Sequence, residues 1–184
     1  GGTGTDTLTF SDATATATVV DADFTNIDNI ETVTLNAGND TITLGAASSA
    51  AGVTTLNILA GTNSVTVGSG HTANLTVAMT SGTDTIDASG YTGALTVTVT
   101  DSNLAATDTL TGGTATDTLT ITGSGNALTA SEMANVTLFE AITMANNNTQ
   151  VMTTHDANVV AGGTMTVTAT ALTNTVFNFN GSAE

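Results

Sequence analysis

Short turns of the form Gly-x-Asp/Asn-x-aliphatic recur along the chain at a nearly constant interval. Three carry the full pattern, at 38–42, 61–65 and 82–86, and a fourth at 106–110 lacks only its Gly. Their aliphatic positions are 42, 65, 86 and 110, so one turn follows another after roughly 21 to 24 residues, the kind of period that marks a repeat architecture. A unit repeated at such a period cannot bury its apolar face alone and stacks on its neighbours. An interval of about 22 residues suits one coil of a β-solenoid with two or three short strands.

Between these turns, Thr alternates with aliphatic residues, as in the segments 96–100, 117–121 and 165–168. Alternation with period two, many β-branched residues and no Pro favour strands. Only two segments, 131–134 and 23–30, offer a helical turn. The sequence therefore predicts an all-β fold: a parallel β-solenoid or β-roll of short strands, about 22 residues per coil, with little or no helix.

A longer repeat overlies the short one. The segment Gly1–Thr9 returns as Gly112–Thr120, and residues 26–35 return as residues 135–144. Because coils of a solenoid share one continuous core, we expect a single repetitive domain over residues 1–184, with long units at about 1–111 and 112–184.

The chain is strongly acidic: it has 16 Asp and Glu residues and no Lys or Arg, for a formal net charge of −16. Nucleic-acid binding and attraction to anionic lipid both need cationic side chains. Enzymes that hold carboxylate or phosphate substrates usually do so with Arg or Lys, and aromatic residues for sugar stacking are scarce. We therefore predict no enzyme activity, no nucleic-acid partner and, without a long apolar segment, no membrane insertion.

Carboxylates without counter-ions repel one another in a compact state. A divalent cation is the simplest source of positive charge, and oxygen-rich sites favour calcium or magnesium. The chain has no Cys, which excludes thiolate zinc sites, iron–sulfur clusters and disulfides.

Gly1–Thr9 matches the nonapeptide G-G-x-G-x-D-x-U-x at every specified position. This pattern marks calcium-binding parallel β-rolls, in which glycines let carbonyls turn inward and the Asp supplies a carboxylate. An imperfect tandem follows, since Asp108, Asp117 and Asn126 are evenly spaced, with nine positions from each to the next. We expect Asp108 and Asp117 to face one cation, with the carbonyl groups of Gly112 and Thr114 as further ligands. Its affinity should be weak, roughly 10⁻⁴–10⁻³ M.

These turns, together with the segments 26–34 and 82–90, resemble bacterial RTX-type surface proteins. The resemblance is greatest to the Thr-rich repeats of Gram-negative S-layer proteins and giant type I-secreted adhesins. It implies secretion, folding on contact with calcium outside the cell, and assembly into lattices or stalks. The residues that inherit the calcium role from it are Asp6, Asp40, Asp84, Asp108 and Asp117.

The expected function is therefore a structural, non-enzymatic, calcium-binding module of an extracellular bacterial surface protein, in an S-layer or another self-assembling structure. Its expected partners are copies of itself or the rest of its parent chain, joined end to end or laterally. Alternatives are a segment of an adhesin stalk, a filament subunit and an ice-binding β-solenoid. Cell-surface polysaccharide is a further candidate partner.

Plainer interpretations stand beside these. Asp and Asn cap turns with their own side chains and need no metal for it. Glu31 and Glu140 occupy equivalent points of the long repeat, which suits a structural hydrogen bond at a coil corner. His71 and His155 do not, so we expect no joint zinc site. Ranks of Thr on a flat face would suit ice binding, but repeats of uneven length with uneven turns are expected to hold no regular array.

Overall fold

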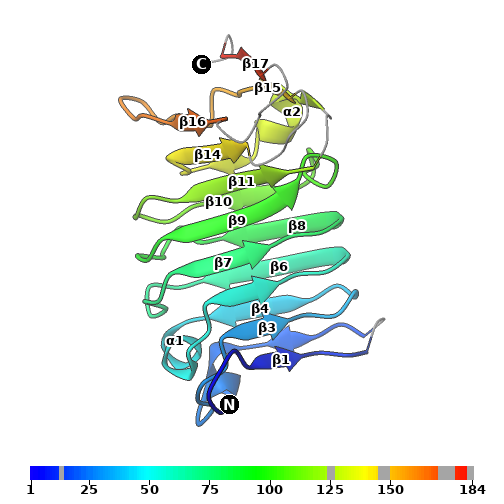
Figure 1. The fold of residues 1–184 in the computed structure, drawn as a ribbon, viewed down its shortest axis with the longest axis vertical. Coiled ribbons are helices and arrows are strands. Elements are labelled where there is room, and N and C mark those ends of the chain that lie inside the picture. The colour runs from blue at the N-terminus through cyan, green and yellow to red at the C-terminus, as the bar shows by residue number, and fades with distance from the viewer. Residues whose placement is uncertain (13–14, 124–126, 145–149, 170–176, 182–184) are drawn as a thin grey trace.

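The chain winds into a parallel β-solenoid, and strands of successive coils lie side by side (Figure 1). The computed structural model describes residues 1–12, 15–123, 127–144, 150–169 and 177–181. Every strand pairing in them is parallel. The predicted all-β solenoid is confirmed.

In the described ranges, three sheets form the walls of the solenoid. Sheet A contains, in spatial order, β1 (Thr7–Thr9), β3 (Thr32–Thr34), β5 (Thr55–Asn57), β7 (Leu75–Ala78), β9 (Leu95–Thr100), β11 (Thr118–Thr122), β14 (Ala141–Met144) and β16 (Thr166–Thr168). Sheet B contains β2 (Thr18–Val19), β4 (Thr41–Leu44), β6 (Gly61–Val67), β8 (Gly82–Asp87), β10 (Thr109–Thr111) and β13 (Val136–Thr137). Sheet C contains β12 (Ala127–Leu128), β15 (Gln150–Thr153) and β17 (Phe177–Asn180).

The core consists of ranks of aliphatic side chains, one residue per coil. In sheet A the rank is Leu8, Val33, Leu56, Val77, Val97, Leu119, Ile142 and Val167. Successive members are roughly 20 to 25 residues apart, which is the period of a stacked repeat, so the expected coil length is confirmed. The six inner members are fully buried, and each contributes about 1.5–3 kcal/mol by the burial of its side chain.

The outward positions of sheet A form two ranks that flank this core rank. Thr fills every position of the two ranks except those of Asn57, Ala78 and Ala141. The expectation that uneven repeats would hold no regular array is therefore wrong. The loops absorb the differences in coil length, and the strands keep one register throughout.

The glycines of the predicted turns stand where neighbouring coils approach closely. A Cβ atom added to Gly82 would lie 1.9 Å from the carbonyl oxygen of Gly61, and one added to Gly61 would lie 2.0 Å from that of Gly38. No side chain fits in either place. The recurring Gly is therefore a steric requirement of coil stacking.

Three short helical segments interrupt the coils of the described residues. They are the 3₁₀ turn η1 (Asp21–Phe24), α1 (Ala46–Ala51) and α2 (Ala130–Met133). The helical turn expected at 131–134 is confirmed with a slightly earlier start, and only the beginning of 23–30 is helical. No pattern in the sequence predicted α1. Within the part of the chain that the structure describes, no helix is long and apolar enough to cross a membrane.

The long repeat is visible in the backbone. Asn29 and Leu138, at equivalent points of the two units, have φ angles of 55° and 58°, values that residues other than Gly rarely adopt. Each follows a helical turn, η1 or α2, and each lies shortly before the Glu of the repeat. Equivalent corners of the two units therefore share one backbone path.

Candidate functional site

The carboxylates predicted to bind calcium lie in one ladder along sheet B and in two separate pairs beside sheet A. The ladder stands where the strands of sheet B begin and consists of Asp40, Asn63, Asp84 and Asp108, one residue per coil. All four side chains are at most 2% exposed.

In this sheet-B ladder, each side chain accepts the backbone N–H of the coil before it. Ala17 donates its N–H to Asp40 Oδ1 at 2.7 Å, and Asp40 donates its N–H to Asn63 Oδ1 at 3.1 Å. Asn63 donates its N–H to Asp84 Oδ1 at 3.3 Å, and Asp84 donates its N–H to Asp108 Oδ1 at 2.9 Å. Asn63 also donates from Nδ2 to Asp84 Oδ1 at 2.8 Å and to the carbonyl oxygen of Leu59 at 2.9 Å. The carboxylates thus tie adjacent coils together.

Two carboxylate oxygens of the sheet-B ladder differ from the others in their hydrogen bonding. Within the part of the chain that the structure describes, Asp40 Oδ2 and Asp84 Oδ2 are buried and have no hydrogen-bond partner, whereas Asp108 Oδ2 accepts the N–H of Ala105 at 2.8 Å. Burial raises the pKa of Asp84 to about 6, against the lowering effect of its hydrogen bonds from Asn63, and the neighbouring Asp108 adds to the rise. An unpartnered buried carboxylate oxygen is costly, so the carboxyl group of Asp84 favours a proton or a cation.

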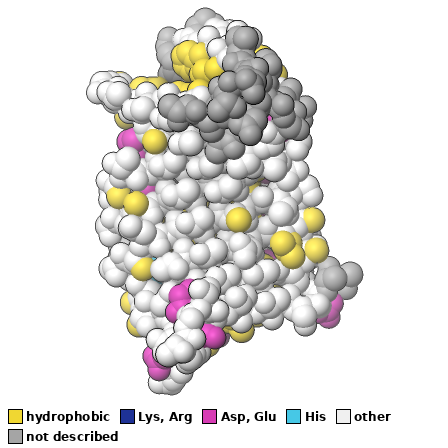
Figure 2. All heavy atoms as spheres, viewed as in Figure 1, with side chains coloured by type: hydrophobic (Ala, Val, Ile, Leu, Met, Phe, Trp, Pro, Cys, Tyr) yellow, Lys and Arg dark blue, Asp and Glu magenta, His cyan; other side chains and the backbone are white. Residues whose placement is uncertain are grey.

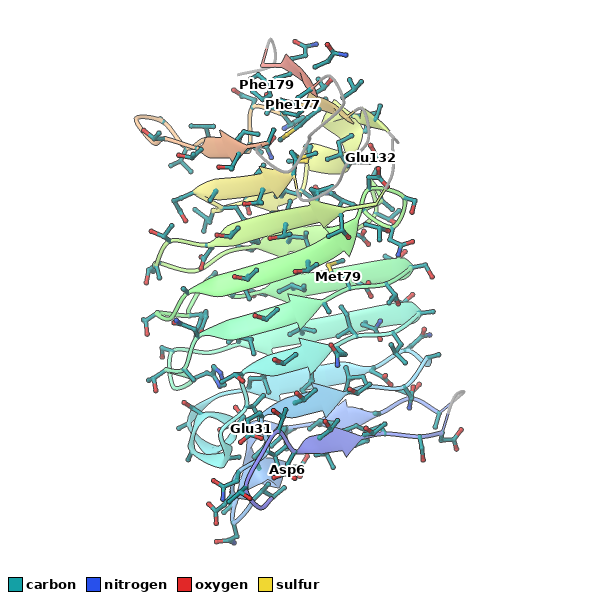
Figure 3. The ribbon with its side chains drawn as sticks, viewed as in Figure 1. Asp6, Glu31, Met79, Glu132, Phe177 and Phe179 are labelled. Atoms are coloured by element: carbon teal, nitrogen blue, oxygen red, sulfur yellow. The ribbon has the colours of Figure 1, made fainter. Side chains whose placement is uncertain are left out.

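The two separate pairs stand where strands of sheet A begin, several coils apart along the solenoid. Asp6 donates its N–H to Glu31 Oε2 at 2.8 Å, and Asp117 donates its N–H to Glu140 Oε2 at 2.9 Å. Figure 3 shows Asp6 and Glu31 together at this edge. The interpretation of Glu31 and Glu140 as structural hydrogen-bond partners at a coil corner is confirmed.

Asp6 and Asp117 also cap the glycine pairs that precede them. Gly2 donates its N–H to Asp6 Oδ2 at 2.7 Å, and Gly113 donates its N–H to Asp117 Oδ2. Asp117 Oδ1 further accepts the N–H of Leu95 at 2.7 Å. Burial raises the pKa of Asp117, opposed by these two backbone hydrogen bonds, and Glu140 raises it further. The aspartate of the nonapeptide thus closes its own turn and joins the next coil.

The structure does not bring Asp108 and Asp117 together, because they begin strands of different sheets. The other two residues predicted beside them act as donors to neighbouring coils. Gly112 donates its N–H to the carbonyl oxygen of Thr137 at 2.9 Å, and Thr114 donates its N–H to that of Tyr91 at 3.0 Å. Among the described residues, no three His, Cys, Asp or Glu side chains gather in a group that could hold a metal ion.

A third carboxylate role was not foreseen from the sequence. Asp21 accepts the N–H groups of Gly45, Ala47 and Ser48 at 2.7, 2.9 and 2.8 Å, and so caps the start of α1 from the preceding coil. Its partial burial would raise the pKa, but the hydrogen bonds from Ser48, Ala47 and Gly45 bring it below the usual value. No local pattern marks this cap, because Asp21 lies a full coil before the helix.

His71 belongs to a buried corner next to α1. Its Nδ1 lies 3.2 Å from Ser48 Oγ, and its ring centroid lies 5.8 Å from that of Tyr91. Among the described residues its Nε2 has no hydrogen-bond partner. Burial lowers the pKa of His71 and raises that of Tyr91 to about 12. This histidine is fully buried, and the corner packs the coils.

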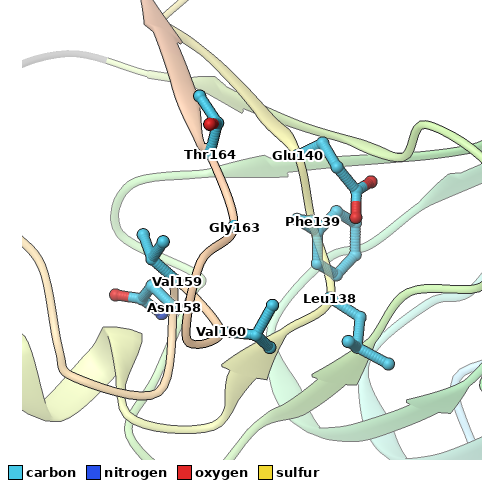
Figure 4. Close-up of a pocket in the computed structure, with 8 residues that line it drawn as sticks. All are labelled: Leu138, Phe139, Glu140, Asn158, Val159, Val160, Gly163 and Thr164. Carbon is cyan, nitrogen blue, oxygen red and sulfur yellow. The ribbon is translucent and has the colours of Figure 1, made fainter.

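A small pocket of about 70 Å³ lies near the C-terminal end, and its lining comes from residues 138–140 and from residues between 158 and 164 (Figure 4). Asn158 donates from Nδ2 to the carbonyl oxygens of Met133 and Val136 at 2.7 Å each, and Glu140 accepts from Asp117. The side chains of Asn158 and Glu140 are therefore engaged in holding neighbouring coils. Comparison of the chain with protein-family models, with curated proteins and with solved structures finds no match.

Proposed function

We propose that this protein is a structural, non-enzymatic module of an extracellular bacterial surface structure of the S-layer type, in which copies assemble end to end with the help of calcium. The observation that carries the proposal is the pair of buried carboxylate oxygens, Asp40 Oδ2 and Asp84 Oδ2, that have no hydrogen-bond partner among the described residues.

Partial burial of the core is confined almost entirely to the end coils. With the single exception of Ala47, the partly buried apolar residues that pack against the core lie near the two ends of the solenoid. They are Leu8, Phe10, Ala17 and Ile27 near one end, and Met165, Val167, Ala169 and Phe177 near the other. The exposed large apolar side chains of the described residues follow the same division, since Val20 lies in the first coil and Val160 and Phe179 lie in the last. Exposed edges of this kind support stacking on a further coil.

The calcium part of the proposal rests on the unpartnered oxygens of Asp40 and Asp84. Calcium takes oxygen ligands from carboxylates, carbonyl groups and water, so each of these atoms fits as the carboxylate ligand of a weak site. Both oxygens of Asp108 and of Asp117 already accept backbone N–H groups. We therefore assign the calcium role first to Asp40 and Asp84.

Two measurements test this function. Circular dichroism in EDTA and then in millimolar calcium should show a weakened and then restored β signal; a signal indifferent to chelation would contradict the calcium part. Light scattering over a range of protein concentrations in calcium should show growing assemblies. A monodisperse monomer at every concentration would contradict the assembly part.

The regular Thr ranks of sheet A favour ice binding as a second candidate. The two ranks carry no charged side chain on any of the eight strands. In Figure 2 the carboxylate side chains lie mainly near the N-terminal end and the margins of the visible face. Thermal hysteresis of a protein solution would support this candidate, and freezing without hysteresis would eliminate it.

A further inference from the structure

The sheet-B ladder crosses the coils of β4, β6, β8 and β10 inside the rod (Figure 1), and its members differ in the second polar atom of the side chain. Each member accepts the N–H of the preceding coil through Oδ1. This common bond orients the side chains alike, so the second atom, Nδ2 in Asn63 and Oδ2 in the aspartates, points the same way in each coil. The contacts of the second atom therefore show which chemistry this position requires.

Asn63 shows that the surroundings of the second atom are oxygen atoms. Its Nδ2 donates to the carbonyl oxygen of Leu59 at 2.9 Å and to Asp84 Oδ1 at 2.8 Å. The first oxygen belongs to the turn of the same coil, and the second belongs to the ladder side chain of the next coil. The amide group of Asn63 thus supplies positively polarised hydrogen atoms to two oxygens that face it.

Asp84 places an oxygen where Asn63 has its amide nitrogen. β6 and β8 pair in register with Asn63 beside Asp84, so Thr80 is the equivalent of Leu59, and Asp108 is the ladder residue of the next coil. Asp84 Oδ2 is therefore directed at the carbonyl oxygen of Thr80 and at Asp108 Oδ1. The Asp84 side chain is fully buried, and its Oδ2 has no hydrogen-bond partner among the described residues. Three oxygens thus converge, and a cation is what they lack.

We infer that a calcium ion binds between Asp84 and Asp108 and joins the coils of β8 and β10, with the carbonyl oxygen of Thr80 as a further ligand. The inference rests on the proposed function and specifies which carboxylates form its stronger calcium site. Calcium takes carboxylate and carbonyl oxygens as ligands, and two carboxylates balance its charge. Asp108 Oδ1 accepts the N–H of Asp84, and a further lone pair of that oxygen is available to the ion.

The two aspartates with an unpartnered oxygen differ in the ladder residue that follows each of them. Asp84 is followed by the carboxylate of Asp108, whose N–H acceptor role brings the two side chains to adjacent coils. Burial raises the pKa of Asp84, and the nearby charge of Asp108 raises it further. Asp40 is followed by the uncharged Asn63, so its junction has one carboxylate. Because affinity for calcium depends on the number of charged ligands, the Asp84 junction binds calcium more tightly than the Asp40 junction.

Burial of this site couples calcium binding to folding. The side chains of Asp84 and Asp108 are at most 2% exposed, so the ion enters as the coils of β8 and β10 stack. A ligand that binds the folded state alone stabilises it by mass action. Calcium should therefore increase the urea concentration at which the wild-type protein unfolds.

Calcium binding to the full-length chain and its variants tests the site. Each protein is refolded from urea in calcium, and bound calcium is measured by equilibrium dialysis at rising calcium concentrations. Asp84→Asn removes one charged ligand and should weaken the strongest site roughly tenfold or more. Asn63→Asp puts a carboxylate next to Asp84 on the preceding coil and should raise the number of bound ions. Asp156→Asn, which removes an exposed carboxylate, is the matched control and should bind calcium as wild type does.

Urea unfolding in EDTA and in calcium gives a second measure, with circular dichroism to verify the fold of each variant. Calcium should stabilise wild type and Asp156→Asn more than Asp84→Asn. Wild-type affinity and equal stabilisation in Asp84→Asn would overturn this site and leave the proposed calcium-dependent function to other carboxylates. Absence of calcium binding to wild type would overturn both the site and the calcium part of the proposed function.

Discussion

Replacing Asp84 with Asn should stabilise the protein at neutral and alkaline pH. The adjacent coil already shows how an amide fits the sheet-B ladder: Asn63 Oδ1 accepts a backbone N–H, and Asn63 Nδ2 donates to the next carboxylate and to the carbonyl oxygen of Leu59. In the Asp84→Asn variant the amide oxygen can keep the two bonds that Asp84 Oδ1 accepts from Asn63, and the NH₂ group takes the place of Oδ2. A buried charge is removed and the ladder is kept.

The magnitude follows from the pKa of Asp84, about 6 in the folded protein against an ordinary value of 3.8. Each pKa unit corresponds to about 1.4 kcal/mol, so the ionised Asp84 costs the folded state about 3 kcal/mol above pH 6. The folded protein binds the extra proton between pH 4 and 6, and the wild-type unfolding free energy therefore falls as pH rises through that window. Below pH 4 both states are protonated and the penalty disappears.

Urea unfolding of wild type and Asp84→Asn in EDTA, at pH values from 4 to 8, measures this difference. We expect the variant to gain up to about 3 kcal/mol at pH 8 and almost nothing at pH 4. Asp156→Asn, which removes an exposed carboxylate, is the control and should change stability little at either pH. A variant that is no more stable at pH 8, or whose gain does not vary with pH, would refute the reasoning.

Three further changes probe other parts of the frame. Gly82→Ala places a Cβ 1.9 Å from a carbonyl oxygen and should cost about 2 kcal/mol or more in urea unfolding, while Gly2→Ala, with open space around it, should cost little. Asp117→Ala leaves two backbone N–H groups without acceptors and should cost about 2 to 4 kcal/mol; Asp6→Ala, which loses one such bond at the end of the rod, should cost less. Burial lowers the pKa of His71, so the unfolded chain binds the proton at a higher pH than the folded protein does. The unfolding free energy of wild type should therefore fall relative to that of His71→Phe as pH falls below about 6.5. Parallel pH profiles of the two proteins would contradict this.

The coil length and the strands were predictable from the sequence because both depend on local patterns. Gly-x-Asp/Asn turns recur where coils approach closely, and Thr alternates with aliphatic residues where a strand has one buried face. The regular Thr ranks were not predictable from the spacing of the turns. Differences in coil length fall in loops, and the strands hold one register.

The roles of the acidic residues were predictable only in part. The sequence located Asp40, Asp84 and Asp108 at equivalent turns, but their hydrogen-bond partners are backbone N–H groups one coil away. The separation of Asp108 and Asp117 along the chain is less than half a coil, which places them at opposite edges of the solenoid. Likewise, Ser48 Oγ accepts the N–H of Gly45 locally, but the carboxylate that caps the start of α1 comes from Asp21 in the preceding coil.

We propose that the module assembles by extending its own solenoid. Electron microscopy of the protein in millimolar calcium tests this end-to-end assembly. Each added copy contributes the eight strands of sheet A and should lengthen the particle by about 38 Å at the ordinary strand spacing. We expect rods of constant width whose lengths increase in such steps. Particles that stay one module long, or that widen without lengthening, would contradict it.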